Sequence, residues 1–370
     1  MTAGSSNAFS GIWFASIGLN PDQIGFISST PIFVLLLLNI FVGRLADRSR
    51  DWRQVIIAGV IAAAIMSFGL LYVRSFWGIL FFWSLSAIAQ SSVTPVADAA
   101  SLRLTARRGT SFGNIRAWGT IGYVAAVFLT GLAVTWFGGS FFMPLFVGLA
   151  VLRAGASLAL PQFRSEEKLK AVHGAATKLS HMLRPWLFLP LLAWAMIFSS
   201  HLVLNAFQTL LWKQQGLPNS VSSGLLALGA LSEAAMFFAF RSLASSYPPR
   251  NLLVVSGVVS TLRWFAMAYS PSIYFLVPMQ LLHSVTFAMG FLGCVNYITQ
   301  WTSEDMSAEA QGFAVVLQQI LAVIMFTVFG HLMALYGAGA YFASSAIAAA
   351  GTCVVLLSFM TRLPSAKVSS

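Results

Sequence analysis

Residues 24–73 read IGFISSTPIFVLLLLNIFVG, then RLADRSRDWR, then QVIIAGVIAAAIMSFGLLYV, and this alternation decides the fold. Two apolar runs of 20 residues each flank a ten-residue loop that carries four arginines. A helix needs about 20 apolar residues to cross a hydrocarbon core of roughly 30 Å, so each run predicts one transmembrane helix. The stretch therefore predicts two transmembrane helices joined by a charged loop.

The same pattern continues along the 370-residue chain. Hydrophobic residues make up 58% of the sequence and charged residues 8%, which excludes a soluble domain of this length. The alternating ten-residue segments of a membrane β-barrel are absent from the sequence, so we expect an all-α membrane protein. Further apolar spans follow at 76–104, 113–137, 141–160, 185–212, 220–241, 252–269, 273–298, 310–336 and 341–360.

A shorter apolar segment, at 8–19, precedes these eleven spans and is too short to cross a membrane. It ends at the turn Asn20-Pro21-Asp22, where a first helix would end. We interpret it as the second half of an incomplete first helix, and a start codon assigned too late would explain it. The segment has no basic n-region and no small-residue cleavage site, so a signal peptide is not expected.

The segment 161–184 is the only long polar stretch, and it divides the helices into six and six. We predict an N-terminal bundle at 1–160, a cytoplasmic linker at 161–184, a C-terminal bundle at 185–361 and a cytoplasmic tail at 362–370. An internal repeat supports this division, because Arg44 and Arg53 recur as Arg241 and Arg250 at a common offset of 197 residues.

The loops differ strongly in their basic residues. One set of alternate loops, with the C-terminal tail, holds sixteen Lys and Arg residues, whereas the opposite set holds Arg74 and Lys213. The positive-inside rule therefore predicts a multi-pass protein of the inner membrane, with both termini in the cytoplasm if the first helix is complete. This topology explains the net charge of +11 without any nucleic acid, and the lipid bilayer is the expected partner of the basic loops.

Five charged side chains lie inside the apolar spans and away from their ends, namely Asp98, Arg116, Arg153, Glu233 and Arg263. A charge at bilayer depth costs about 2.5–3.5 kcal/mol on insertion scales, so each must face protein, water or a ligand. We therefore expect the functional site among them. Their three positive and two negative charges leave one positive charge, which would suit a substrate carboxylate.

The loop Gly43-Arg44-Leu45-Ala46-Asp47-Arg48-Ser49-Arg50 resembles the loop between the second and third helices of the major facilitator superfamily. This resemblance implies the major facilitator fold, with two six-helix bundles around a site at the membrane midplane. It also implies a gating role for Gly43, Asp47 and Arg48. The alternative is that the arginines only retain the loop in the cytoplasm.

Other stretches are similar to phenylpropionate permeases and their nucleoside and lactose permease relatives. They are PVADA (95–99), GNIRAWG (113–119), LRW (262–264) and QLLHSVTF (280–287), and the similarity runs from about residue 17 to the end. The resemblance implies that Asp98 and Arg116 contact substrate, the alternative being an ion pair that ties their two helices together. Trp118 is a candidate for covering an apolar ring of the substrate.

Glu233, Arg263 and His283 lie on successive spans, the last two near the midplane. Lactose permease has a comparable trio that couples proton movement to substrate. This resemblance implies proton coupling by Glu233 and His283, and substrate binding by Arg263. That relative also has a carboxylate three residues after the histidine, where this chain has Thr286. The alternatives are a permanent salt bridge between Glu233 and Arg263 and an uncharged, hydrogen-bonding His283.

The sequence therefore predicts a transporter and not an enzyme. We expect a proton-coupled symporter of a small organic solute, such as an aromatic acid, that acts as a monomer and uses no cofactor. The histidines lack the close helical spacing of a metal site, so no metal is expected. A proton-driven exporter (antiporter) and a non-transporting membrane sensor remain as alternatives.

Overall fold

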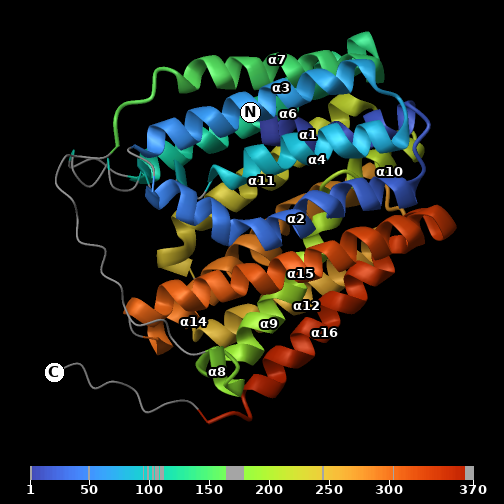
Figure 1. Ribbon diagram of the computed structural model, residues 1–370. Coiled ribbons are helices and arrows are strands. Elements are labelled where there is room, and N and C mark those ends of the chain that lie inside the picture. Colours follow the sequence, from blue (N-terminus) through green and yellow to red (C-terminus); the bar gives the residue numbers. More distant parts are fainter. Residues whose placement is uncertain are drawn as a thin grey trace. The chain divides into compact units, whose positions relative to one another are not determined.

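The structure is a computed structural model of the chain. It describes residues 2–48, 51–94, 112–163, 179–243, 246–302 and 304–362, together with residues 96, 97, 100, 101, 104 and 108. Every regular element in these ranges is a helix, which confirms the all-α class (Figure 1). The same residues include seven segments that are long and apolar enough to span a membrane.

The chain forms two compact units, the first from Met1–Lys170 and Leu204–Ala227, the second from Ala171–Val203 and Leu228–Ser370. Residues 204–227 thus group with the N-terminal helices. The expected bundle boundaries at residues 160 and 185 stay a prediction.

Helix α3 packs against both α4 and α7 in the first unit (Figure 1). Side-chain hydrogen bonds at the N-termini fix where the helices of the first unit begin. Asn20 and Gln23 exchange hydrogen bonds at the start of α2, and the Asp51 carboxylate accepts from the Arg53 N–H at the start of α3. The helices of this unit are α1 (Thr2–Ser16), α2 (Pro21–Arg48), α3 (Trp52–Tyr72), α4 (Phe76–Ser92), α6 (Phe112–Phe137), η1 (Gly139–Phe141), α7 (Phe142–Ser157), α10 (Gln208–Gln214) and the start of α11 (Asn219–Leu243).

Helix α16 lies beside α9 and α12 in the second unit (Figure 1). These helices and α14 contribute to a buried core that includes Leu191, Trp194, Leu253 and Tyr297. The helices of this unit are α8 (Leu179–Met182), α9 (Pro185–Ser200), η2 (His201–Leu204), the rest of α11, α12 (Pro249–Met267), α13 (Ile273–Leu281), the π-helix η3 (Ser284–Met289), α14 (Gly290–Trp301), α15 (Glu304–Tyr336), η4 (Gly337–Ala340) and α16 (Tyr341–Ser358).

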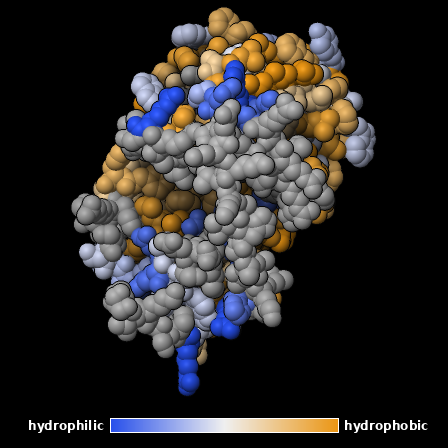
Figure 2. Space-filling model, turned by 60° about the vertical axis from the view of Figure 1, so that its left-hand side comes forward, coloured by the Kyte–Doolittle hydropathy of each residue, from blue (hydrophilic) through white to orange (hydrophobic). Residues whose placement is uncertain are grey.

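Large apolar side chains cover much of the outer surface. Phe238 and Tyr274 are 84% and 85% exposed, and Figure 2 shows broad hydrophobic areas on one face. Polar groups lie between helices instead, where the hydroxyl oxygens of Ser67 in α3 and Ser86 in α4 are 2.9 Å apart. A membrane provides the apolar surroundings that such a surface needs, so this distribution fits a multi-pass membrane protein.

Two expected spans are interrupted in the structure. The span 185–212 divides into α9, η2 and α10, with Ala206 in the left-handed region at a φ of 68°. The N–H of Ala206 donates to the Asn7 carbonyl of α1 at 2.9 Å, and a Cβ at Gly11 would lie 1.5 Å from the Ala206 oxygen. Helix α1 therefore contacts the break closely. The span 273–298 contains the π-helix η3 between α13 and α14.

Candidate functional site

The candidate site lies in the second unit, where α11, α12 and the junction of α13 with η3 meet. Small residues allow these helices to approach closely. A Cβ at Gly290, directly after η3, would lie 2.4 Å from Ser256 of α12 and from the Trp194 ring of α9. On α11, the Ser232 hydroxyl donates to the Gln280 carbonyl of α13 at 3.3 Å. These contacts fix the relative positions of three helices that each carry a polar residue of the site.

Substitution of Gly290 should show how much the site depends on this packing. We expect Gly290→Val to lower the stability of the protein by about 1–3 kcal/mol, the usual cost of overpacking a filled interior. Thermal unfolding of the purified protein in detergent measures the effect. The matched control is Gly312→Val in α15, because no other described part of the chain comes within 4 Å of a Cβ at Gly312. Equal melting temperatures of the two variants would contradict the proposed packing.

Three of the expected site residues form a continuous chain of contacts. Arg263 Nη1 lies 3.3 Å from His283 Nδ1, and His283 Nε2 lies 3.2 Å from Glu233 Oε2. The side chains of His283 and Glu233 are 13% and 27% exposed, whereas Arg263 is 1% exposed. The structure thus brings the acid, the imidazole and the guanidinium together, with the acid closest to solvent.

The contacts define the tautomer of His283. A guanidinium nitrogen can only donate, so Nδ1 must accept from Arg263 and carries no proton. The imidazole proton therefore lies on Nε2 and is donated to the Glu233 carboxylate. His283 is neutral in this arrangement. It separates Arg263 from Glu233, so the imidazole is a bridge between them.

Arg263 uses only one of its three nitrogens for hydrogen bonds within the described residues. Nη1 donates to Thr286 Oγ1 at 3.0 Å and contacts His283, while Nε and Nη2 are buried without a hydrogen-bond partner there. These two nitrogens form the edge that matches a carboxylate in a bidentate pair. Trp264 lies against the guanidinium, with its ring centroid 4.6 Å from the central carbon. Arg263 therefore has two donors left for a carboxylate, and protein atoms enclose both of them in this structure.

The π-helix η3 aligns the residues that contact Arg263. His283 precedes η3 and Thr286 lies within it, and both contact Nη1 of Arg263. The Ser256 hydroxyl of α12 donates to the Thr286 carbonyl at 2.7 Å, which ties η3 to α12. Single π-turns inside α-helices often mark functional sites. Thr286 supplies a neutral hydroxyl at this contact.

Sequence reasoning did not include His201 or Ser200 in the site. The His201 ring, 4% exposed, lies 5.7 Å from the His283 ring between centroids, and its Nδ1 donates to the Ile197 carbonyl at 2.9 Å. Ser200 accepts a hydrogen bond from the Trp264 indole at 2.9 Å. The only sequence signal was the polar run Ser199-Ser200-His201 at the end of an apolar span.

The other expected site residues are less informative. Asp98 lies outside the described residues, and so do the side chains of Gly43, Asp47 and Arg48, which are in the last turns of α2, and of Arg116, which is in α6. Trp118 is 73% exposed. In the first unit, Arg153 Nη1 lies 3.5 Å from the Thr2 hydroxyl. Nothing in the described residues therefore tests the roles expected of the first unit's charged residues.

Comparison with known proteins identifies the class. Residues 2–323 match the family described as the MFS_1 like family. The chain belongs to this family. It is a major facilitator superfamily transporter and not an enzyme, and it moves a small-molecule substrate through a membrane that it crosses several times.

Curated relatives of this transporter are permeases and transporters. It is 24% identical over 341 residues to a probable 3-phenylpropionic acid transporter of Escherichia coli (strain K12), with 87% of each chain covered. It is also 27% identical over 303 residues to a maltose permease of Geobacillus stearothermophilus, with 79% of this chain and 74% of the relative covered.

Solved structures share the fold of the transporter. The nucleoside transporter NupG has a TM-score of 0.84 at 16% identity, covering 98% of this chain and 96% of that one. A D-xylose-proton symporter has a TM-score of 0.72 at 12% identity, covering 96% and 93%. At these identities the likeness shows the major facilitator fold alone, which confirms the expected fold class.

Proposed function

We propose that this transporter is a proton-coupled symporter of a small organic anion, an aromatic acid being the expected class. It would act as a monomer in the inner membrane, by alternating access and with both termini in the cytoplasm. Asp98, Arg116 and Trp118 would contribute to substrate binding, and Gly43, Asp47 and Arg48 to gating. The observation that carries the proposal is the chain of contacts from Glu233 through His283 to Arg263.

The charges of this chain of contacts explain how proton and anion are linked. With Glu233 ionised and His283 neutral, the positive charge of Arg263 is balanced. Protonation of Glu233 leaves one uncompensated positive charge on a guanidinium that is 1% exposed. Such a charge is costly in an apolar interior unless an anion joins it. Binding of one proton therefore favours binding of one monovalent anion, and the empty and loaded sites carry the same net charge.

Aromatic rings beside the chain of contacts support an aromatic acid. Phe287 stacks on His283 with 5.2 Å between ring centroids, and Phe198 lies 5.8 Å from Phe287. A ring carried by the substrate could pack against these groups while its carboxylate pairs with the Nε and Nη2 edge of Arg263. The similarity to the probable 3-phenylpropionic acid transporter of Escherichia coli supports this class of substrate.

Uptake by right-side-out membrane vesicles tests the proposal, with radiolabelled 3-phenylpropionate as the first probe. We expect an inward proton gradient to raise the initial rate, and a potassium diffusion potential set by valinomycin to leave it unchanged, because one proton enters with each anion. Uptake that ignores the proton gradient would reject coupling. Gradient-driven accumulation found only in inverted vesicles would show an exporter instead.

A further inference from the structure

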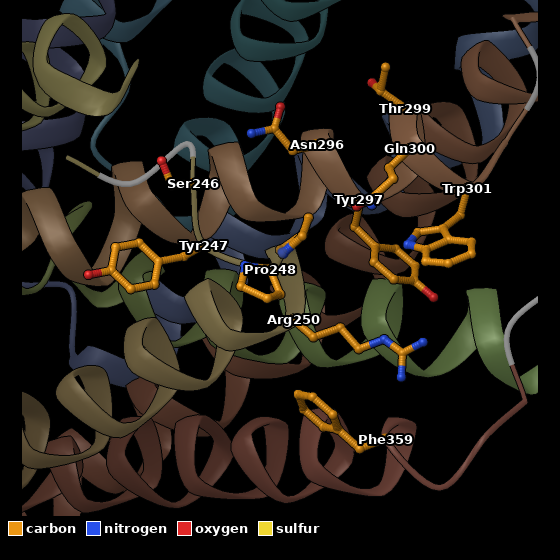
Figure 3. A pocket seen from close by; sticks show the side chains of 11 residues that line it. Ser246, Tyr247, Pro248, Arg250, Asn296, Tyr297, Thr299, Gln300, Trp301 and Phe359 are labelled. Atoms are coloured by element: carbon orange, nitrogen blue, oxygen red, sulfur yellow. The ribbon is translucent and has the colours of Figure 1, made fainter. Parts of the chain in front are cut away.

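A cavity of about 710 Å³ lies in the second unit (Figure 3), and none of the residues that line it belongs to the Glu233 cluster. Its walls come from the loop before α12, the first turn of α12, the last turns of α14 and the residue after α16. The apolar segments Ile273–Trp301 and Glu309–Ser358 both end here. The cavity therefore lies at the boundary of the membrane, where lipid headgroups are found.

Arg250 is the charged residue of this cavity. It is 7% exposed, and its Nη1 donates to the Ser358 carbonyl at 2.7 Å. Its Nη2 is buried without a hydrogen-bond partner in the part of the chain that the structure describes. The guanidinium lies between two rings, 5.5 Å from the Tyr297 centroid and 5.4 Å from the Phe359 centroid (Figure 3). An unpaired donor of a buried cation is costly, and an anion would satisfy it.

The remaining lining suits an anion as well. Among the eleven residues that line the cavity, none is Asp or Glu, and Arg250 is the single charged one. Asn296, Thr299 and Gln300 add side chains that can donate hydrogen bonds. Trp301 and Tyr247 are aromatic residues of the kind enriched at the headgroup level of a membrane. One positive charge with neutral donors matches a singly charged oxyanion.

The first unit shows the same arginine in a different setting. Arg53, at the corresponding place in the internal repeat, donates through Nη2 to the Leu158 carbonyl at 2.7 Å, just after α7. The residue that caps its helix is Asp51, whose carboxylate also accepts from the N–H of the buried Phe163. In the second unit, the residue before the helix is Pro248, which has no carboxylate. The position that holds Asp51 in the first unit is therefore a proline in the second, so Arg250 has no acid at that position.

We propose that this cavity binds a phosphate group through Arg250 and Gln300, and that the group belongs to the headgroup of an anionic phospholipid or to soluble phosphate. The shared chemistry is one phosphate oxygen on Nη2 of Arg250, with the Gln300 amide donating to another. The end of α12 that carries Arg250 is expected to face the cytoplasm, so the lipid would come from the inner leaflet. Capping of α16 by Nη1 continues unchanged when the phosphate binds.

The test measures binding to the purified full-length protein in detergent. Phosphatidylglycerol, phosphatidylcholine and inorganic phosphate are titrated separately, and native mass spectrometry counts bound lipid while thermal unfolding reports stabilisation. We expect phosphatidylglycerol to bind and raise the melting temperature, and phosphatidylcholine not to. Arg250→Gln should weaken this binding by about tenfold, the effect of one charge-assisted hydrogen bond.

Two further variants separate binding from folding. Asn296→Trp should fill the cavity and abolish the lipid effect, although Arg250 and its bond to Ser358 remain. Arg53→Gln loses the corresponding helix-capping bond in the first unit and should leave lipid binding unchanged. If inorganic phosphate alone binds and is lost in both cavity variants, the ligand is the soluble anion. Phosphatidylglycerol binding that survives both Arg250→Gln and Asn296→Trp would overturn the proposal. So would the absence of binding by both phosphatidylglycerol and inorganic phosphate.

Discussion

Glu233→Gln is expected to abolish proton-driven uptake while leaving exchange of one anion for another intact. The amide resembles the protonated carboxyl, so the positive charge of Arg263 stays available to an anion. The variant can neither bind nor release a proton at this position. The proton gradient can therefore no longer drive the step in which the empty transporter returns to the outside. Uptake by vesicles with an inward proton gradient should drop to the rate without a gradient. Counterflow of labelled against unlabelled anion should persist.

The control for this variant is Glu309→Gln in α15, an acid outside the Glu233 cluster. It should keep the response to the gradient. Loss of counterflow together with driven uptake in Glu233→Gln would indicate that Glu233 is needed to form the site, as in a permanent salt bridge. Retention of both activities would show that the proton binds elsewhere.

Arg263→Lys is expected to reduce anion affinity by about tenfold or more, since at least one charge-assisted hydrogen bond is lost. The wild-type guanidinium contacts His283 and Thr286 through Nη1 and leaves the Nε and Nη2 edge for a carboxylate. A lysine ammonium is a compact charge, and it cannot bind His283 and Thr286 on one side and a carboxylate on the other in one plane as a guanidinium can. The expected signature is a raised KM for anion uptake with retained folding.

Arg74→Lys provides the matched control, because Arg74 is exposed and donates to carbonyls of its own helix end. Its KM should equal that of the wild type. A third variant, Arg263→Met, removes the charge and should abolish anion binding in equilibrium measurements. Full affinity in Arg263→Lys would show that Arg263 acts only as a neutralising charge, and full affinity in Arg263→Met would remove it from the substrate site.

Much of the fold could be predicted from the apolar runs and from the Gly, Pro and charged residues that end them. The run 54–73 corresponds to α3 (Trp52–Tyr72), and the run 341–360 to α16 (Tyr341–Ser358). The break at Ala206 could not be predicted, because it depends on α1, with Asn7 as its hydrogen-bond partner and Gly11 giving the space. These residues are nearly 200 positions away in the sequence, and no local pattern connects them.

The candidate site was predictable to the extent that charges in apolar runs are rare. Rarity singled out Glu233 and Arg263, and helix depth added His283. The bridging position of His283 depends on the π-helix η3, which leaves no pattern in the sequence QLLHSVTF. His201 reaches the same cluster because α9 ends beside α12, a packing relation set by glycines such as Gly257 and Gly351 on the neighbouring helices.

The number of protons that enter with each anion tests the central claim most directly. Purified transporter in liposomes, loaded with a pH-sensitive dye and given labelled anion, yields both fluxes in one experiment. The account predicts about one proton per monovalent anion, because Glu233 provides one proton-binding carboxylate and Arg263 one anion-binding cation, joined by a neutral His283. Anion entry without any change in internal pH would contradict it.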